Sequence, residues 1–101
     1  MKKIINGKMY NTETAKEIDF ASNYLSERDF KHYEENLYKK KTGEFFLYGH
    51  GGPASKYRTP CGDMWSGGEK IIPLTVDEAK SWVEKNSSTE TYIELFGEVE
   101  E

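Results

Sequence analysis

A glycine-rich segment, residues 49–68, constrains the fold of this chain more than any other stretch of the sequence. It reads GHGGPASKYRTPCGDMWSGG and holds six of the nine glycines and two of the three prolines. Because glycine and proline interrupt both the helical and the strand period, the sequence predicts one long irregular loop here. The segment also contains Tyr57, Met64 and Trp65, whereas disordered linkers are poor in aromatic residues. Long ordered loops in small domains are usually functional, so we expect this loop to carry recognition.

The charge of the chain is distributed unevenly. The net charge is −4, but residues 1–74 carry twelve basic and ten acidic side chains, whereas residues 75–101 carry two lysines and eight acidic side chains. An acidic chain is a poor general binder of a phosphate backbone, since such binding needs many positive contacts. The acidic C-terminal part is either a solvated helical surface or a surface that docks on a basic, nucleic-acid-binding protein.

Length and cysteine content narrow the class of protein. A chain of 101 residues with 14% aromatic content fits one folded domain. One cysteine excludes an internal disulfide, and no Cys/His pattern has the spacing of a zinc site. The opening residues, MKKIING, lack the apolar core of a signal peptide, and no apolar run approaches the roughly 18 residues that span a membrane. We therefore expect a cytoplasmic protein with reduced Cys61, no membrane contact, and no metal or other cofactor.

Two hairpins and an edge strand are predicted from short-range signals, so that residues 1–48 are rich in strands. Asn6-Gly7 lies between short apolar runs and tolerates the positive φ of a type I′ turn, which indicates a hairpin. A second hairpin is expected over residues 33–48, with three solvated lysines at its turn. After the long loop, Pro73 confines a strand over residues 70–74 to a sheet edge or a strand end.

The C-terminal quarter is predicted to form two short helices, over about residues 76–86 and 88–96. The apolar stripe of the first helix consists of Val76, Ala79, Trp82 and Val83. The predicted end signals are a capping box at Thr75 and Glu78, an N-cap at Ser87 and a stop at Gly97. A small antiparallel sheet followed by two short helices defines an α+β fold.

One combination of loop residues has the composition of a catalytic site. His50 is followed by Ser55, Cys61 and Asp63, which supply a base, two nucleophiles and an orienting acid. Catalytic groups need a rigid frame, and an irregular loop offers none, so we expect no catalysis through these residues. A histidine hydrogen-bonded to the backbone is the interpretation favoured for His50.

The glycines and the cations of the loop leave two interpretations open. GHGG is not a dinucleotide-binding fingerprint, because Pro53 follows and no helix pattern begins there. Backbone N–H groups together with Lys56 and Arg58 could form a local anion site. The alternative is that the glycines only let the backbone turn tightly, which is the interpretation we favour.

Two surfaces are candidates for binding a partner. Tyr and Arg are enriched at interface hot spots, but Tyr57 could equally pack inward, and Trp65 could either anchor the loop to the sheet or stay exposed. The loop candidates are His50, Lys56, Tyr57, Arg58 and Trp65. The rival acidic-helix candidates are Glu84, Glu90 and Glu94.

Three segments together resemble a family of small proteins encoded on phages and integrative elements of Gram-positive bacteria. The segments read KKIINGKMYNTETAKEI, LYKKKTGEFFLYGHGGPASKY and SGGEKIIPLT, the last followed by an acidic helix, and they cover nearly the whole chain. In relatives the loop commonly has a GEGG-type turn followed by Ser-Lys-Tyr. His50 replaces that acidic residue here, which speaks against an essential carboxylate at this position.

This family includes anti-CRISPR proteins that inhibit type II Cas9 nucleases. The resemblance implies a non-enzymatic inhibitor in the cytoplasm of a bacterial host, which binds Cas9 or its complex with guide RNA or interferes with guide loading. It implies no catalytic residues. Two other functions stay open: a nucleic-acid-binding accessory protein of a mobile element, and a small hydrolase or nuclease built around His50.

Overall fold

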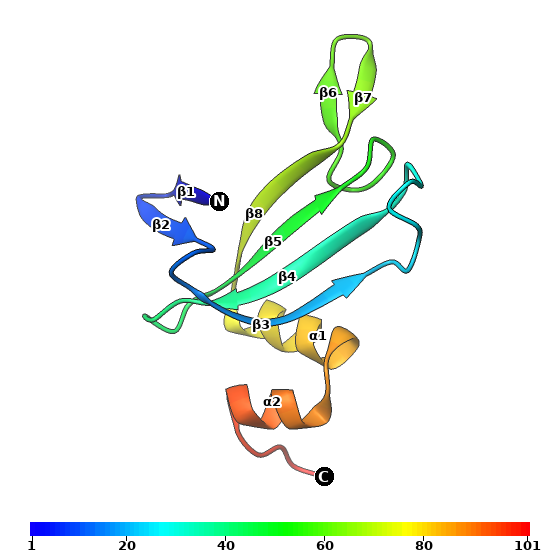
Figure 1. Ribbon diagram of the computed structural model, residues 1–101. Coiled ribbons are helices and arrows are strands. Elements are labelled where there is room, and N and C mark those ends of the chain that lie inside the picture. Colours follow the sequence, from blue (N-terminus) through cyan, green and yellow to red (C-terminus); the bar gives the residue numbers. More distant parts are fainter.

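The computed structural model describes residues 1–101 as three antiparallel sheets and two C-terminal helices (Figure 1). The predicted α+β fold is confirmed. The strands are β1 (Lys2–Ile5), β2 (Lys8–Asn11), β3 (Lys16–Ser22), β4 (Tyr33–Lys39), β5 (Phe45–Gly51), β6 (Thr59–Cys61), β7 (Met64–Ser66) and β8 (Gly68–Leu74). The helices are α1 (Val76–Asn86) and α2 (Thr89–Phe96). Neither helix is long and apolar enough to cross a membrane.

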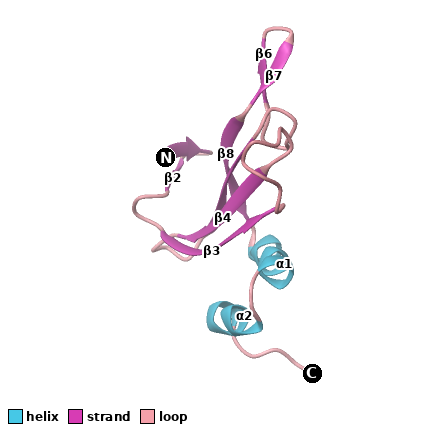
Figure 2. Ribbon diagram, turned by 45° about the vertical axis from the view of Figure 1, so that its right-hand side comes forward, coloured by secondary structure: helices cyan, strands magenta, loops and turns pink.

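The central sheet has the strand order β3-β4-β5-β8, with every neighbouring pair antiparallel. The predicted second hairpin is therefore confirmed as β4 and β5. Pro73 lies on β8, an edge strand, where its missing N–H breaks no ladder between two neighbours. Both helices lie on one face of this sheet, as the turned view shows (Figure 2).

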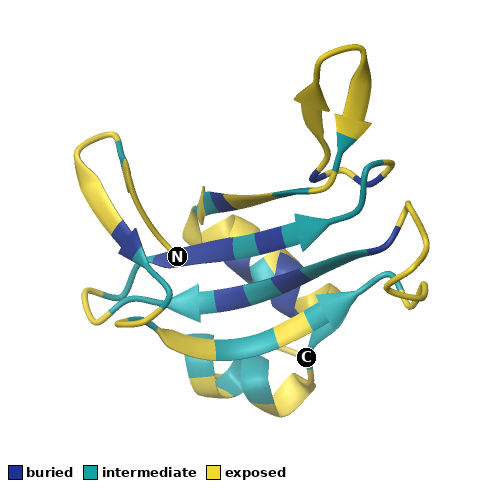
Figure 3. Cartoon of the chain, turned by 45° about the horizontal axis from the view of Figure 1, so that its top comes forward, coloured by how far each residue is buried: buried dark blue, intermediate teal, exposed yellow.

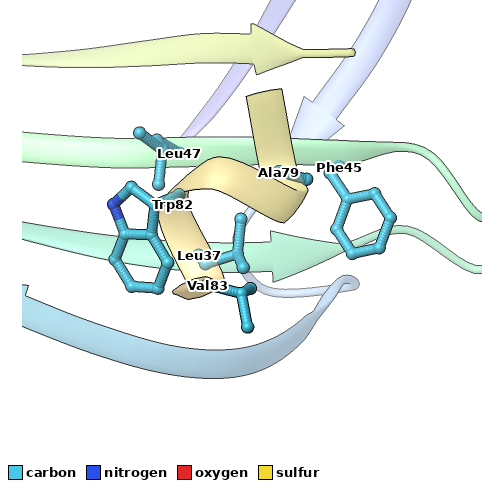
Figure 4. Packing of buried hydrophobic residues seen from close by; sticks show 6 residues of the cluster. All are labelled: Leu37, Phe45, Leu47, Ala79, Trp82 and Val83. Carbon is cyan, nitrogen blue, oxygen red and sulfur yellow. The ribbon is translucent and has the colours of Figure 1, made fainter. Parts of the chain in front are cut away.

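The main core lies between that face and the helices (Figure 4). Alternation along the strands brings one set of side chains to this face, and helical spacing brings another set from α1 against it. The six buried residues are Leu37, Phe45, Leu47, Ala79, Trp82 and Val83. Val76, which was predicted in the same stripe, is exposed at the first residue of α1, before the part of the helix that supplies buried side chains to the core.

A second, smaller core covers part of the opposite face. The β1–β2 hairpin has the predicted Asn6-Gly7 turn, with φ of 50° and 78° at the two residues. It folds Tyr10 onto Phe46 and Ile71, and the Tyr10 and Phe46 rings meet edge to face at 5.5 Å. Both faces of β5 are thus covered at this end of the sheet.

The helix ends follow the predicted capping signals with one exception. Thr75 and Glu78 form the capping box, and Gly97, with φ of 89°, ends α2. Ser88 caps α2 instead of Ser87 and accepts a hydrogen bond from the Thr91 N–H at 3.1 Å. The hydroxyl of Ser87 donates to Asp19 on β3 and so fixes the end of α1 to the sheet.

The prediction of an irregular loop over residues 49–68 is wrong. Strand β5 continues to Gly51, β8 already begins at Gly68, and residues 59–66 form a hairpin of their own. The ladders to β4 and β8 hold the glycines extended, although glycine has little strand preference of its own. Only residues 52–58 remain as a connecting loop.

Candidate partner-binding site

The β6–β7 hairpin projects beyond the central sheet and pairs with no other strand (Figure 1). Its strands join through a two-residue turn in which Gly62 has φ of 62°. Met64 and Trp65 keep 74% and 52% of their surface exposed. Figure 3 shows the hairpin as exposed except where β7 ends at its base, in contrast to the buried middle of β4 and β5. Two large apolar side chains on a projecting arm are typical of a binding element.

Arg58 orients the exposed tryptophan from the base of the hairpin. Its guanidinium carbon lies 4.5 Å from the centre of the Trp65 ring, within the range of a cation–π contact. The sequence left open whether Trp65 anchors the segment to the sheet or stays exposed, and the structure places it in the exposed position. Arg58 and Trp65 are therefore the two predicted loop residues that form a surface together.

A second exposed segment lies at the same end of the sheet. The loop 23–32 is joined to loop 52–58 by backbone hydrogen bonds from Gly52 N–H to His32 C=O, at 2.8 Å, and from Ala54 N–H to Phe30 C=O, at 2.7 Å. Tyr24 is 96% exposed and has φ of 61°, which is uncommon for a residue with a side chain. We call the exposed apolar residues of this end the hairpin end: Tyr24, Leu25, Phe30, Met64 and Trp65.

Sequence reasoning missed the contribution of loop 23–32 to this end. Three large apolar side chains among charged and turn-forming residues give neither a strand nor a helix period. A signal was nevertheless present in the sequence. Large apolar residues that follow neither a strand nor a helix period are not predicted to lie in the core, so they could have been expected at the surface.

A buried carboxylate holds the base of the hairpin end. Glu35 on β4 accepts hydrogen bonds from the Tyr57 hydroxyl, from Trp82 Nε1 at 3.3 Å and from Lys56 Nζ at 2.8 Å. It thereby joins β4, loop 52–58 and α1 at one point. A groove of about 670 Å³ passes beside it along α1, with Tyr33 and Trp82 among its lining residues.

The Glu35 carboxylate is stabilised in its charged form. Burial by itself would raise the pKa of Glu35, but the hydrogen bonds from Lys56, Tyr57 and Trp82 hold that pKa below its ordinary value of 4.5. Burial and the hydrogen bond to this carboxylate raise the pKa of Tyr57 far above its usual range. The pair is therefore a neutral phenol donating to a carboxylate across the neutral pH range.

The glycines of the segment GHGG, residues 49–52, are explained better by close packing of neighbouring side chains than by tight turns of the backbone. The Tyr57 ring crosses β5 at Gly49, where an added Cβ would lie 1.9 Å from a ring carbon. At Gly51 an added Cβ would lie 2.4 Å from the Ser55 hydroxyl. Neither residue has a positive φ, so the favoured interpretation of a tight turn is wrong: these glycines make room for loop 52–58 to fold back on the sheet.

The predicted loop residues do not form one site. Lys56 is half-exposed and pairs with Glu35, whereas Tyr57 is buried and supports the hairpin without reaching the surface. His50 belongs to β5 rather than to a loop. Its side chain lies on the face of the sheet opposite the helices, whereas Lys56 and Tyr57 contact Glu35 on the helix face. Its Nε2 lies 3.4 Å from Glu34 Oε2, so its partner is a carboxylate and not the expected backbone group.

The residues considered for catalysis and for anion binding are also separated. The Ser55 hydroxyl donates to Gly52 C=O and accepts from Tyr57 N–H, while Cys61 is exposed on the hairpin. No group of three or more His, Cys, Asp or Glu side chains is placed to hold a metal ion. Lys56 and Arg58 are engaged by Glu35 and Trp65, which disfavours a backbone anion site between them.

The acidic-helix candidates form a surface of their own. Glu84 on α1 and Glu90 and Glu94 on α2 are all exposed. The helices lie below the sheet and the β6–β7 hairpin lies above it in Figure 1. The two predicted surfaces can therefore be altered independently.

The chain was compared with protein-family models, with curated proteins and with solved structures, and none of them matches it.

Proposed function

We propose that this protein is a non-enzymatic inhibitor of a type II Cas9 nuclease, which acts by docking its hairpin end on the nuclease. The observation that carries the binding role is the exposure of Met64 and Trp65 on a projecting hairpin with a fixed base. The class of partner rests on the resemblance of three sequence segments to phage-encoded anti-CRISPR proteins.

The hairpin end has the properties of an interface hot spot. Large aromatic side chains that are already oriented lose little conformational freedom on binding, so more of their burial contributes to affinity. The Arg58–Trp65 stack and the hydrogen bonds at Glu35 supply that prior orientation. The hairpin is thus a better candidate for the main contact than a set of solvated carboxylates, since rim charges mostly change association rates.

A target-cleavage assay with purified Cas9 tests the proposal. We expect stoichiometric loss of cleavage when the protein is added, and addition before or after the guide RNA separates interference with loading from binding to the complex. Trp65→Ala and Met64→Ala together should weaken inhibition at least tenfold. Ile4→Ala is a matched control, because Ile4 is an equally exposed apolar residue on the distant β1–β2 hairpin. Full cleavage at molar excess across several Cas9 orthologues would contradict the proposal.

The acidic helices are the alternative contact surface for the same function. Cas9 holds nucleic acid in basic channels, in which Glu90 and Glu94 could take the place of phosphates. If they do, Glu90→Lys with Glu94→Lys abolishes inhibition while the Trp65→Ala variant still inhibits. We expect the reverse.

A nucleic-acid-binding accessory protein of a mobile element is the second candidate function. It predicts a salt-dependent gel shift with DNA or RNA in the absence of Cas9. Lys56 and Arg58 already make contacts within the chain, with Glu35 and Trp65. The observation that favours this function is therefore the set of lysines in the N-terminal part.

A further inference from the structure

The outer edge of strand β7 has an unpaired backbone donor and acceptor at Trp65. In the β6–β7 ladder, Pro60 is directly opposite Trp65. Proline has no N–H, so these two residues cannot exchange a pair of hydrogen bonds. Opposite residues in an antiparallel ladder alternate between hydrogen-bonded and non-hydrogen-bonded pairs, so the bonds of this hairpin lie in the pairs on either side. The N–H and C=O of Trp65 therefore point away from β6.

No other part of the chain pairs with these two groups. The strands β6 and β7 form a sheet of two strands only, and none of the backbone hydrogen bonds outside the helices and strands involves Trp65. The hairpin projects past the neighbouring loops, so that both of its outer edges face solvent (Figure 1). A partner can thus reach the backbone of Trp65 as well as its exposed indole.

The other edge strands of the molecule carry features that oppose pairing with a further strand. Proteins protect exposed edges with proline, with charged side chains, lysine above all, and with β-bulges. Here these features are Lys2 and Lys3 on β1, Lys8 on β2, the register shift between Glu17 and Asp19 on β3, Pro60 on β6, and Pro73 on β8. The sequence of β7, Met-Trp-Ser, contains no charge and no proline, and its register has no shift. The outer edge of β7 is therefore the unprotected one.

We propose that β7 binds an extended segment of the partner nuclease as an added strand, which pairs with the N–H and C=O of Trp65. This inference rests on the proposed function and names the mode of contact. Strand addition at an exposed edge is a common mode of recognition, in which main-chain hydrogen bonds give affinity and side chains give specificity. The residue opposite Trp65 would lie on the same face as the indole that Arg58 holds, a position that favours an aromatic or β-branched side chain.

Main-chain pairing and side-chain burial can be separated at this one position. Trp65→Ala removes the indole but keeps the outward N–H, whereas Trp65→Pro removes both. A proline at position 65 leaves the ladder to β6 intact, because that ladder does not use the N–H of Trp65, just as it does not need one at Pro60. The difference between the two variants is therefore the contribution of the backbone donor.

A Cas9 cleavage assay with these variants tests the proposal. Against a Cas9 orthologue that the parent protein inhibits, we expect Trp65→Pro to need about fivefold more protein for half-inhibition than Trp65→Ala needs, as for the loss of one hydrogen bond. Pro60→Ala is the matched control. It adds an N–H to the edge of β6, leaves the edge of β7 unchanged, and should inhibit as the parent protein does. Thermal unfolding of all variants checks that the fold is intact.

Amide hydrogen exchange gives a second measurement that does not depend on the folding of a proline variant. Exchange proceeds in the complex with the same Cas9, is then quenched, and is measured by NMR on the released parent protein. We expect the Trp65 amide to exchange at least tenfold more slowly in the complex than in the isolated protein, because it gains a hydrogen-bond acceptor.

The outcomes that contradict the proposal are distinct from those that contradict the proposed function. Equal inhibition by folded Trp65→Pro and Trp65→Ala would overturn strand addition, and so would a Trp65 amide that exchanges equally fast in the complex. A dimer in sedimentation analysis that Trp65→Ala retains and Trp65→Pro loses would assign the edge to a second copy of this chain instead. If the parent protein inhibits no Cas9 orthologue, the proposed function fails and the inference fails with it.

Discussion

The carboxylate of Glu35 joins three elements that are far apart in the sequence. Its partners are Tyr57 and Lys56 from the connecting loop and Trp82 from α1. A buried charge without partners is strongly unfavourable, whereas this one has a donor from each side. The residue therefore decides how the hairpin end is attached to the sheet and the helix.

Replacement of Glu35 by Gln should lower stability and change its pH dependence. The loss of a charge-assisted contact to Lys56 should decrease the free energy of unfolding by about 2 kcal/mol at pH 7. The folded pKa of Glu35 lies below the ordinary 4.5, so its contribution is present above pH 4.5 and is lost as pH falls below that value. Denaturant unfolding between pH 7 and 3 should therefore show a smaller decrease for Glu35→Gln than for the parent. Equal slopes would show that Glu35 contributes nothing to acid sensitivity.

Gly49 is the residue at which a single methyl group should do the most damage. The added Cβ of Gly49→Ala would lie 1.9 Å from a carbon of the Tyr57 ring, and we expect a loss of about 3 kcal/mol or more in the free energy of unfolding. Gly43→Ala is the control: it has open space but φ of 94°, and should cost about 1 kcal/mol. Thermal and denaturant unfolding measure both. If the clash is the cause, Gly49→Ala adds little further destabilisation to Tyr57→Ala.

At the scale of elements, the β6–β7 hairpin differs from every other strand pair. A lone two-stranded hairpin is marginally stable in water, and this one has no core of its own. The β1–β2 hairpin is also two-stranded, but Tyr10 ties it to Phe46 and Ile71. The β1–β2 hairpin is therefore packed against the central sheet, whereas the β6–β7 hairpin projects without a core of its own.

Amide hydrogen exchange should reveal this difference between elements. We expect the amides of β6 and β7 to exchange faster than those of the central sheet, through local opening of the hairpin, and the amides of β4 and β5 to exchange only through global unfolding. Exchange measured by NMR or mass spectrometry resolves these segments. Protection of β6–β7 equal to that of β4–β5 in the isolated protein would contradict its being a free arm, whereas protection gained with Cas9 would identify the bound element.

At the scale of the whole molecule, charged and apolar side chains are segregated. The molecule extends 49 Å along its longest axis, with the hairpin end at one end of the sheet. The acidic helices lie against one face of the sheet. The exposed apolar surface and the acidic surface are therefore separate parts of the molecule.

Local signals were sufficient for much of the fold. Three signals that act through neighbours within a few residues were predicted correctly. They are the hairpin turn at Asn6-Gly7, the capping box at Thr75 and Glu78, and the edge strand that contains Pro73. The candidate site was predicted less well. Lys56 and Tyr57 were predicted as partner contacts, but their role depends on Glu35, which lies more than twenty residues earlier.

The sequence by itself determined the elements, because turns, caps and strand alternation depend on short-range backbone geometry and on apolar periods. The tertiary structure alone decided what residues 49–68 become. Ladders to β4 and β8 extended the glycines into strands, and the Tyr57 ring took the space that those glycines leave. The exposure of Trp65 was decided in the same way, since it depends on how distant segments meet in the folded chain.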